Sequence, residues 1–172
     1  MNLETAIQIK NDHSSDLIRR INIILHAYAS LHVFQRRDEP IAPRTLTYAS
    51  SNPYELQFGY SRAVRKGPYI FVSGTTSVDP KTGHVRHPDS AYLQTLVIFK
   101  EIINAIERLQ GSKEDVARVR MFVTEQQDTE AVGRALNESF GDVRPAATMI
   151  VGSRFVDKDM KVEIEADAVV LV

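Results

Sequence analysis

The sequence contains neither cysteine nor tryptophan. Without cysteine, the chain has no disulfide, no thiol nucleophile and no cysteine–metal site. The chain also has no excess of charge of one sign, because 21 basic residues are balanced by 22 acidic ones. We therefore expect no overall positive potential that would attract nucleic acid or an anionic membrane. The longest apolar run, residues 21–34, is interrupted by polar side chains and is shorter than a membrane span. We therefore expect a cytoplasmic protein with neither nucleic-acid nor membrane partners.

The sequence also shows no motif typical of a phosphate-binding loop, a catalytic triad or a metal site. No Gly-rich phosphate loop and no Ser-His-Asp arrangement stands out. His84 and His87 have a spacing that suits metal ligands, but no third ligand matches them. We interpret them as solvated histidines and expect no metal site.

The C-terminal part of the chain has the clearest pattern. Between residues 161 and 168, apolar and charged side chains alternate strictly, which predicts a strand with one apolar face. Its apolar face carries Val162, Ile164, Ala166 and Ala168, and its other face carries Lys161, Glu163, Glu165 and Asp167. A second run at 146–151 follows Pro145, which cannot donate to a strand ladder and so marks the strand start. We interpret the two runs as a β-hairpin closed by the turn at 157–159.

The preceding elements complete an α+β pattern. Strands are predicted at 60–64, 69–73 and 116–124, and helices at 91–110 and from 128 or 129 to 140. The order is ββαβαββ, with both helices on one sheet face, which gives a two-layer sandwich. The other sheet face is mixed and is expected to be a subunit interface. It carries Arg118, Arg120, Phe122, Glu163, Glu165 and Asp167.

The N-terminal third differs from the rest. An amphipathic helix is predicted from about residue 14 to Arg37, followed by a linker or extended lead-in over 38–57. This helix either packs on its own domain or a neighbouring subunit, or binds a separate partner. We divide the chain into residues 1–50, the N-terminal amphipathic helix and linker, and residues 51–172, the α+β domain.

Six short strings in this order resemble one family. They are Gly59–Val64, Phe71–Thr75, Gln94-Thr95, Glu114–Val116, Arg144–Ala146 and Val162–Ala166. Together they resemble the Rid family, also called YjgF-like, of reactive imine and enamine deaminases. The resemblance covers roughly residues 58–171.

The resemblance implies a chorismate-mutase-like fold and a homotrimer, with three sheets facing inward as a barrel. It implies ligand clefts between subunits. The implied substrate is a 2-imino or 2-enamine acid, which is hydrolysed to a 2-oxo acid and ammonia. It also implies that no metal or organic cofactor takes part.

By position, the family's cleft tyrosine matches Tyr60 and its acid/base glutamate matches Glu163. The arginine that clamps the substrate carboxylate is replaced by Ala147, which cannot supply the bidentate contact. The chain therefore resembles a subgroup that lacks the deaminase arginine.

Other groups are candidates for holding the substrate. Arg62 lies two residues from Tyr60, on the same face of the predicted strand, and is a candidate replacement for the clamp. Backbone amides near Gly74 and Thr75 are candidates for anion binding. The set of expected substrate-binding residues is Arg62, Gly74, Thr75, Ala147 and Arg144; Arg154 is interpreted as solvated.

Each assignment has a structural alternative. Glu163 would form an ion pair with Arg118 or Arg120, Arg62 would pair with a sheet-face carboxylate, and Tyr60 would be an ordinary half-buried tyrosine.

The sequence is compatible with two functions. The first is Rid-like hydrolysis of an imine, an enamine or a related labile C–N metabolite. The alternative is a non-catalytic trimer that binds a small, carboxylate-bearing metabolite or recruits a partner.

Overall fold

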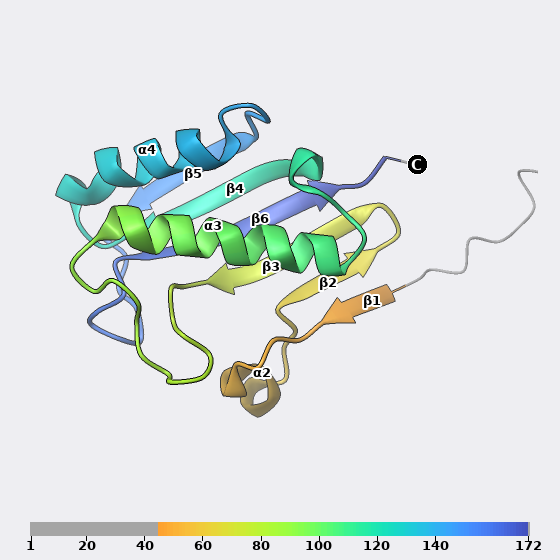
Figure 1. The fold of residues 1–172 in the computed structure, drawn as a ribbon, viewed down its shortest axis with the longest axis horizontal. Coiled ribbons are helices and arrows are strands. Elements are labelled where there is room, and N and C mark those ends of the chain that lie inside the picture. Colours follow the sequence, from red (N-terminus) through yellow and green to blue (C-terminus); the bar gives the residue numbers. More distant parts are fainter. Residues whose placement is uncertain (1–44, 172) are drawn as a thin grey trace, which may run out of the picture. The chain divides into compact units, whose positions relative to one another are not determined.

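The computed structural model describes residues 45–171, and the helix expected at about 14–37 lies outside them. In the described part, six strands form one sheet, accompanied by three α-helices (Figure 1). The strands are β1 (Thr45–Tyr48), β2 (Ala63–Lys66), β3 (Tyr69–Thr75), β4 (Val116–Val123), β5 (Ala146–Val151) and β6 (Val162–Val169). The helices are α2 (Pro53–Phe58), α3 (Ala91–Arg108) and α4 (Thr129–Phe140).

The sheet order is β1-β2-β3-β6-β4-β5. Strands β2 and β3 form the predicted hairpin. The predicted hairpin of β5 with β6 is wrong, because β5 pairs in parallel with β4, and β6 lies antiparallel between β3 and β4. Residues 152–161 between β5 and β6 make a longer connection than the two to five residues of a tight hairpin. Helix α4 supplies the crossover that a parallel β4–β5 pair needs.

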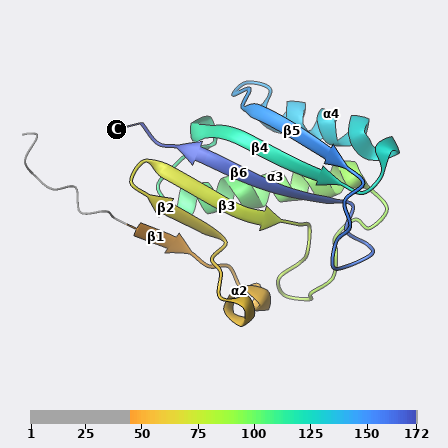
Figure 2. The same cartoon turned by 180° about the vertical axis from the view of Figure 1, so that it is seen from behind.

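The predicted two-layer α+β sandwich is confirmed. Helices α3 and α4 cover one face of the sheet in Figure 1, and Figure 2 shows the opposite face without helices over it. Along β6, the apolar residues predicted to face inward are buried and the charged residues between them are half-buried. The strict alternation in the sequence therefore identified the core side of the central strand.

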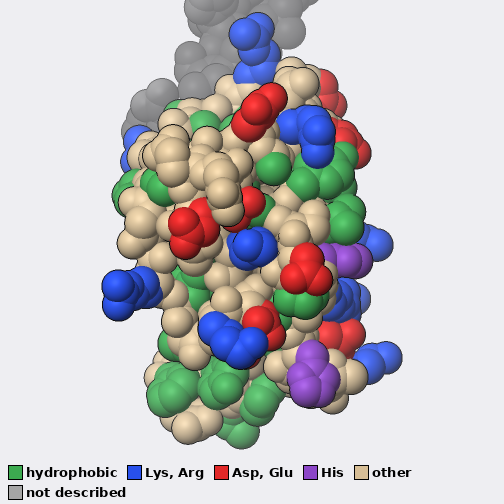
Figure 3. Space-filling view, turned by 90° about the vertical axis from the view of Figure 1, so that its left-hand side faces the viewer, with side chains coloured by type: hydrophobic (Ala, Val, Ile, Leu, Met, Phe, Trp, Pro, Cys, Tyr) green, Lys and Arg blue, Asp and Glu red, His purple; other side chains and the backbone are tan. Residues whose placement is uncertain are grey.

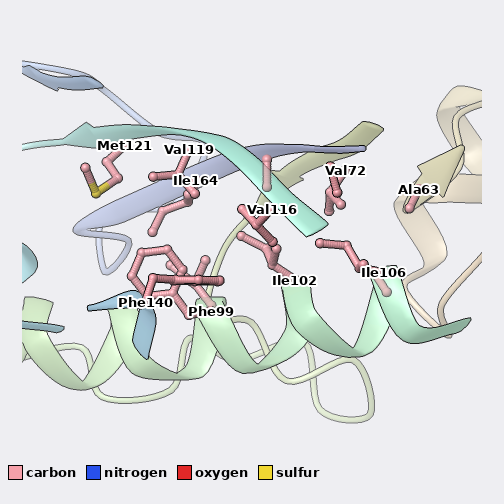
Figure 4. Packing of buried hydrophobic residues seen from close by; sticks show 14 of the residues in the cluster. Ala63, Val72, Phe99, Ile102, Ile106, Val116, Val119, Met121, Phe140 and Ile164 are labelled. Atoms are coloured by element: carbon pink, nitrogen blue, oxygen red, sulfur yellow. The ribbon is translucent and has the colours of Figure 1, made fainter. Parts of the chain in front are cut away.

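The core lies between the sheet and the two helices (Figure 4). Ile102 and Ile106 of α3 point toward Val116 and neighbouring strand residues. Phe99 of α3 and Phe140 of α4 meet edge to face, with ring centroids 5.1 Å apart. Aromatic pairs in this arrangement add stabilisation beyond the area that they bury, so this contact fastens the two helices to each other.

The uncovered sheet face carries the mixed charges that the alternation predicted. Arg120 of β4 bridges two carboxylates of β6, at 3.1 Å from Glu165 and 2.8 Å from Asp167. Ala117 is also exposed, although strict alternation with Arg118 and Arg120 on the uncovered face would place it on the core side. The reason is a register shift between Val116 and Arg118, because a β-bulge turns the following side chains to the other face.

The stretch predicted as a linker, 38–57, contains two ordered elements. Residues 45–48 form edge strand β1, which pairs antiparallel with β2. Helix α2 begins after Asn52, whose side chain accepts a hydrogen bond from the Tyr54 amide, and has Pro53 in its first turn. Both are favourable helix starts. The boundary between residues 50 and 51 remains a prediction, but the sheet extends N-terminal of it.

Charge of both signs is mixed over the surface in Figure 3. Within residues 45–171, no group of three His, Asp or Glu side chains is placed to hold a metal ion, and His84 and His87 are both exposed. No helix in that part of the chain is long and apolar enough to cross a membrane.

Gln94 of α3 holds two loops at one end of the sheet. Its side chain is fully buried. Nε2 donates to the carbonyls of His87 (3.1 Å) and Asp159 (2.8 Å), and Oε1 accepts from the Lys161 amide (2.9 Å). One side chain therefore connects the loop before α3 with the connection between β5 and β6.

Replacing Gln94 by leucine is expected to lower the free energy of unfolding by about 2–3 kcal/mol, because it leaves buried backbone groups without partners. Urea unfolding at constant m-value measures the change. The control is Lys100→Leu, at an exposed position of the same helix, for which a change within about 0.5 kcal/mol is expected. Equal effects of the two substitutions would refute this role of Gln94.

Candidate functional site

An open groove of about 520 Å³ lies at one end of the sheet. Its walls come from α2 and the segment that follows it, the β3–α3 loop and the β5–β6 connection, which Figure 2 shows at the same end of the sheet. Its lining residues are Asn52, Tyr54, Phe58, Tyr60, Arg62, Gly74, Thr76, Val78, Arg154, Phe155, Val156, Met160 and Glu163. The groove thus brings together four of the residues selected from the sequence: Tyr60, Arg62, Gly74 and Glu163.

Glu163 reaches the groove because Gly74 has no side chain. The register between β3 and β6 shifts between Val72 and Thr75, and the Glu163 side chain lies against the backbone at Gly74. A Cβ atom at position 74 would collide with the Glu163 carboxylate. A side chain at position 74 would force the Glu163 carboxylate to move, so the position of the carboxylate depends on the glycine.

The environment of Glu163 disfavours its charged form. Burial raises the pKa of the Glu163 carboxyl above its ordinary value of 4.5, and the negative charge of Glu165 raises it further, while Arg62 acts in the opposite direction. The ion pair with Arg118 or Arg120 that was the alternative for Glu163 is not formed, since Arg120 pairs with Glu165 and Asp167. A carboxyl with a raised pKa in a groove is suited to proton transfer.

The raised pKa predicts a pH-dependent gain in stability for Glu163→Gln. The folded state binds the Glu163 proton more tightly than the unfolded state, so the contribution of the carboxyl to stability is full below pH 4.5 and is lost as pH rises through the folded pKa. The glutamine variant should therefore be more stable than wild type at pH 8, with the difference shrinking toward pH 4. Urea unfolding at both pH values tests this, and a difference independent of pH would contradict it.

Tyr60 and Arg62 lie in the segment that leads into β2, because the strand begins at Ala63 rather than at Tyr60 as predicted. Tyr60 is 37% exposed. The Arg62 guanidinium lies 5.8 Å from the centre of the Tyr60 ring, within the range of a cation–π contact. The two side chains therefore form one wall of the groove, although they are not on a strand.

Arg62 is held by a buried network. Its Nε donates to Glu55 Oε1 of α2 at 3.0 Å, and its Nη1 donates to the Gly74 carbonyl at 2.7 Å and to Thr75 Oγ1 at 3.1 Å. Glu55 also accepts from the amide (2.7 Å) and hydroxyl (2.6 Å) of Ser50. The ion pair considered as the alternative for Arg62 is thus present, but its partner comes from α2 rather than from the sheet face.

The remaining predicted site residues have other surroundings. Thr75 is buried, and its hydroxyl, besides accepting from Arg62, donates to the Ser73 carbonyl at 2.8 Å. Ala147 lies on β5 beside β4, and Arg144 has a positive φ of 58° in the turn before β5. Within one chain, neither lines the groove described above. Thr75 does not line the groove either. The contribution of these three residues to a ligand site therefore remains a prediction.

Sequence reasoning missed Glu55, the aromatic pair of α2 and Arg154. The Asn-Pro start of α2 was the signal for the helix, and with it for the positions of Tyr54 and Phe58. Their rings stack with centroids 5.8 Å apart. Arg154 was interpreted as solvated; it is exposed, yet it lines the groove. Arg154 reaches the groove because it lies in the long connection between β5 and β6. The predicted β5–β6 hairpin gave no reason to expect this position.

The fold and the groove define a class, namely single-sheet α+β proteins with a groove of small-molecule size that is lined by both apolar and charged side chains. Residues 52–170 match the family described as Endoribonuclease L-PSP. The chain belongs to this family, which includes the YjgF-like or Rid proteins that the sequence resembles.

Individual relatives agree with this membership. An uncharacterized protein of Streptomyces coelicolor is 36% identical over 119 residues, 69% of this chain and 87% of the relative. A 2-iminobutanoate/2-iminopropanoate deaminase of Salmonella typhimurium is 32% identical, over 72% of this chain and 96% of the relative. A crystal structure from Mycobacterium tuberculosis, described as a member of the YjgF/YER057c/UK114 family, has 32% identity and a TM-score of 0.66, covering 73% of this chain and 99% of that one.

Proposed function

We propose that the protein hydrolyses a 2-imino acid, in equilibrium with its enamine, to the 2-oxo acid and ammonia in the groove that contains Glu163. One observation carries this proposal. The Glu163 carboxyl has a raised pKa and is held against Gly74, in a groove with Tyr60 and Arg62. The 32% identity to a 2-iminobutanoate/2-iminopropanoate deaminase supports the reaction class.

The reaction needs one water and no change of oxidation state. Water adds to C2 of the imine, so that a C–O bond forms and a carbinolamine results. The C–N bond then breaks, ammonia leaves and the 2-oxo acid remains. Glu163 accepts a proton from the attacking water and passes it to the imine nitrogen as the carbinolamine forms. When the C–N bond breaks, the carboxylate accepts the proton of the new hydroxyl group and passes it to the departing nitrogen, which is the work of a general acid/base with a raised pKa.

The residues around Glu163 have supporting roles. The Tyr60 ring and the Arg62 guanidinium form the wall beside the reacting carbon. Arg62 is fixed by Glu55, so its position does not depend on the substrate. A wall that is organised before the substrate binds lowers the cost of orienting it.

We also propose that the uncovered sheet face joins three copies of the chain. Tyr69 and Phe71 of β3 stack there with ring centroids 6.4 Å apart and are about half exposed. Exposed apolar groups of this kind mark interaction surfaces. Sedimentation equilibrium of the full chain should give about 58 kDa, three times the 19.4 kDa of one chain; a mass of one chain would refute the trimer.

The alternative function is binding without turnover. The observation that favours it is Ala147, which stands where the family's deaminases have the clamp arginine. The groove would then hold a carboxylate-bearing metabolite, and the protein would act as a sensor or as a partner-recruiting module.

Turnover of freshly generated imino acids separates the two functions. An amino-acid oxidase with catalase produces the imino acids of alanine, leucine and phenylalanine in the presence of the full-length protein. Hydrolysis predicts that ammonia and 2-oxo acid appear faster than in buffer alone. Absence of acceleration by wild type, together with acceleration by Ala147→Arg, would favour the binding function instead.

A further inference from the structure

The groove has an apolar side that the proposed chemistry does not use. Tyr54 and Phe58 stack with their ring planes 14° apart and are 48% and 67% exposed. Val156, at 94% exposure, Phe155 and Met160 line the same groove. Large apolar side chains gathered at a groove, rather than scattered over the surface, mark a binding site.

The groove also contains a guanidinium without a described carboxylate partner. Arg154 lies three residues beyond the end of β5, is exposed and lines the groove. Among residues 45–171, the ion pairs involve other cations. Arg154 is therefore placed to receive a negative charge from a ligand.

Arg62 is less suited to this task. Its Nε and Nη1 already donate to Glu55, Gly74 and Thr75, and the Glu55 carboxylate neutralises its charge. Forming a new bidentate contact with a ligand carboxylate would break part of this buried network. Arg154 can reorient without such a loss, because it is exposed.

We propose that the groove selects 2-imino acids with a bulky apolar or aromatic side chain, whose carboxylate is bound by Arg154 and whose side chain packs on Tyr54 and Phe58. This inference rests on the proposed function for the imine, but the carboxylate and the apolar side chain are recognised independently of turnover. The clamp arginine missing at position 147 is thus replaced from the β5–β6 connection. The length of that connection allows the replacement.

The first test compares substrates. Wild type should hydrolyse the imino acids of phenylalanine and leucine with kcat/KM about 10–100-fold higher than that of alanine, because only the larger side chains reach the apolar wall. Phe58→Ala should remove most of this preference, because it should lower kcat/KM far more for the phenylalanine- and leucine-derived imino acids than for the alanine-derived one. The matched control is Leu56→Ala, since Leu56 is 92% exposed on the same helix and does not line this groove.

The second test concerns the anion. Arg154→Ala should lower kcat/KM about 100-fold for every imino acid, mainly by raising KM. Arg154→Lys should recover part of the loss, because lysine keeps the positive charge but lacks the paired donors of the guanidinium. Lys158→Ala is the matched control, an exposed cation of the same connection that pairs with Asp159. Equal kcat/KM for small and bulky imino acids, or an unchanged KM in Arg154→Ala, would overturn the inference while leaving the proposed hydrolysis intact.

Binding of stable 2-oxo acids separates this inference from the proposed function. Phenylpyruvate carries the same carboxylate and aromatic group as the phenylalanine-derived imino acid, and pyruvate lacks the ring. Calorimetry should give a Kd for phenylpyruvate at least about 10-fold lower than for pyruvate, weakened in both Arg154→Ala and Phe58→Ala. This pattern without turnover would reject hydrolysis and keep the recognition; equal binding of both acids by all variants would reject the recognition.

Discussion

Replacing Glu163 by glutamine is expected to lower kcat/KM for imino acid hydrolysis by about 10²–10⁴-fold. Glutamine has nearly the same shape and can keep the contact with Gly74, but it cannot exchange a proton with water or with the departing nitrogen. A positioned acid/base contributes a factor of this size. The measurement is the initial rate of ammonia release in the oxidase-coupled assay, with wild type and variant at equal concentration.

Glu165→Gln is the matched control for this substitution. Glu165 lies two residues along the same strand face, but it pairs with Arg120, which keeps Asp167 as a partner. We expect a change of less than about threefold, because Glu165 does not line the groove and its half-exposed pair with Arg120 contributes little. If Glu163→Gln and Glu165→Gln reduced the rate equally, Glu163 would have no special role in the reaction.

Replacing Glu55 by alanine is expected to lower the free energy of unfolding by about 3–5 kcal/mol, the cost of leaving a buried charge without its partner. Glu55 and Arg62 are 3% and 8% exposed and are joined at 3.0 Å. The loss would also leave the Ser50 amide and hydroxyl without their acceptor. Urea unfolding monitored by circular dichroism measures the change.

Two comparisons make the Glu55 result specific. Asp142→Ala removes an exposed ion pair with Lys113 at 2.6 Å and should cost less than about 1 kcal/mol. The double variant Glu55→Leu with Arg62→Met should be more stable than Glu55→Ala alone, because it removes both charges together. If Glu55→Ala lowered the free energy of unfolding by less than about 1 kcal/mol, the prediction would be wrong, because water would then be solvating the Arg62 charge in place of Glu55.

The sequence predicted the layers of the fold well because periodicity reports on burial. The alternation in β6 identified both its core face and its charged face. Periodicity does not identify the partner of a strand, however. For this reason β5 was paired with β6 instead of β4. A short edge strand such as β1 has too few residues for its alternation to stand out from a loop.

The candidate site was predictable only in part, for a related reason. Tyr60, Gly74 and Glu163 lie on or beside strands, and the groove brings them together. Glu55 and Arg154 lie on a six-residue helix and in a connection, whose paths depend on tertiary contacts such as those of Gln94. Sequence reasoning therefore missed residues in the groove, such as Arg154, and behind it, such as Glu55, that are positioned by long-range contacts.

The pH profile of kcat/KM tests most directly whether Glu163 carries the chemistry. If Glu163 acts as a general base, wild-type kcat/KM should rise with pH through an ionisation above 4.5, the ordinary value for this carboxyl. This rise should be absent from the residual activity of Glu163→Gln. The same rising limb in wild type and in Glu163→Gln would contradict the account, because another group would then control the reaction.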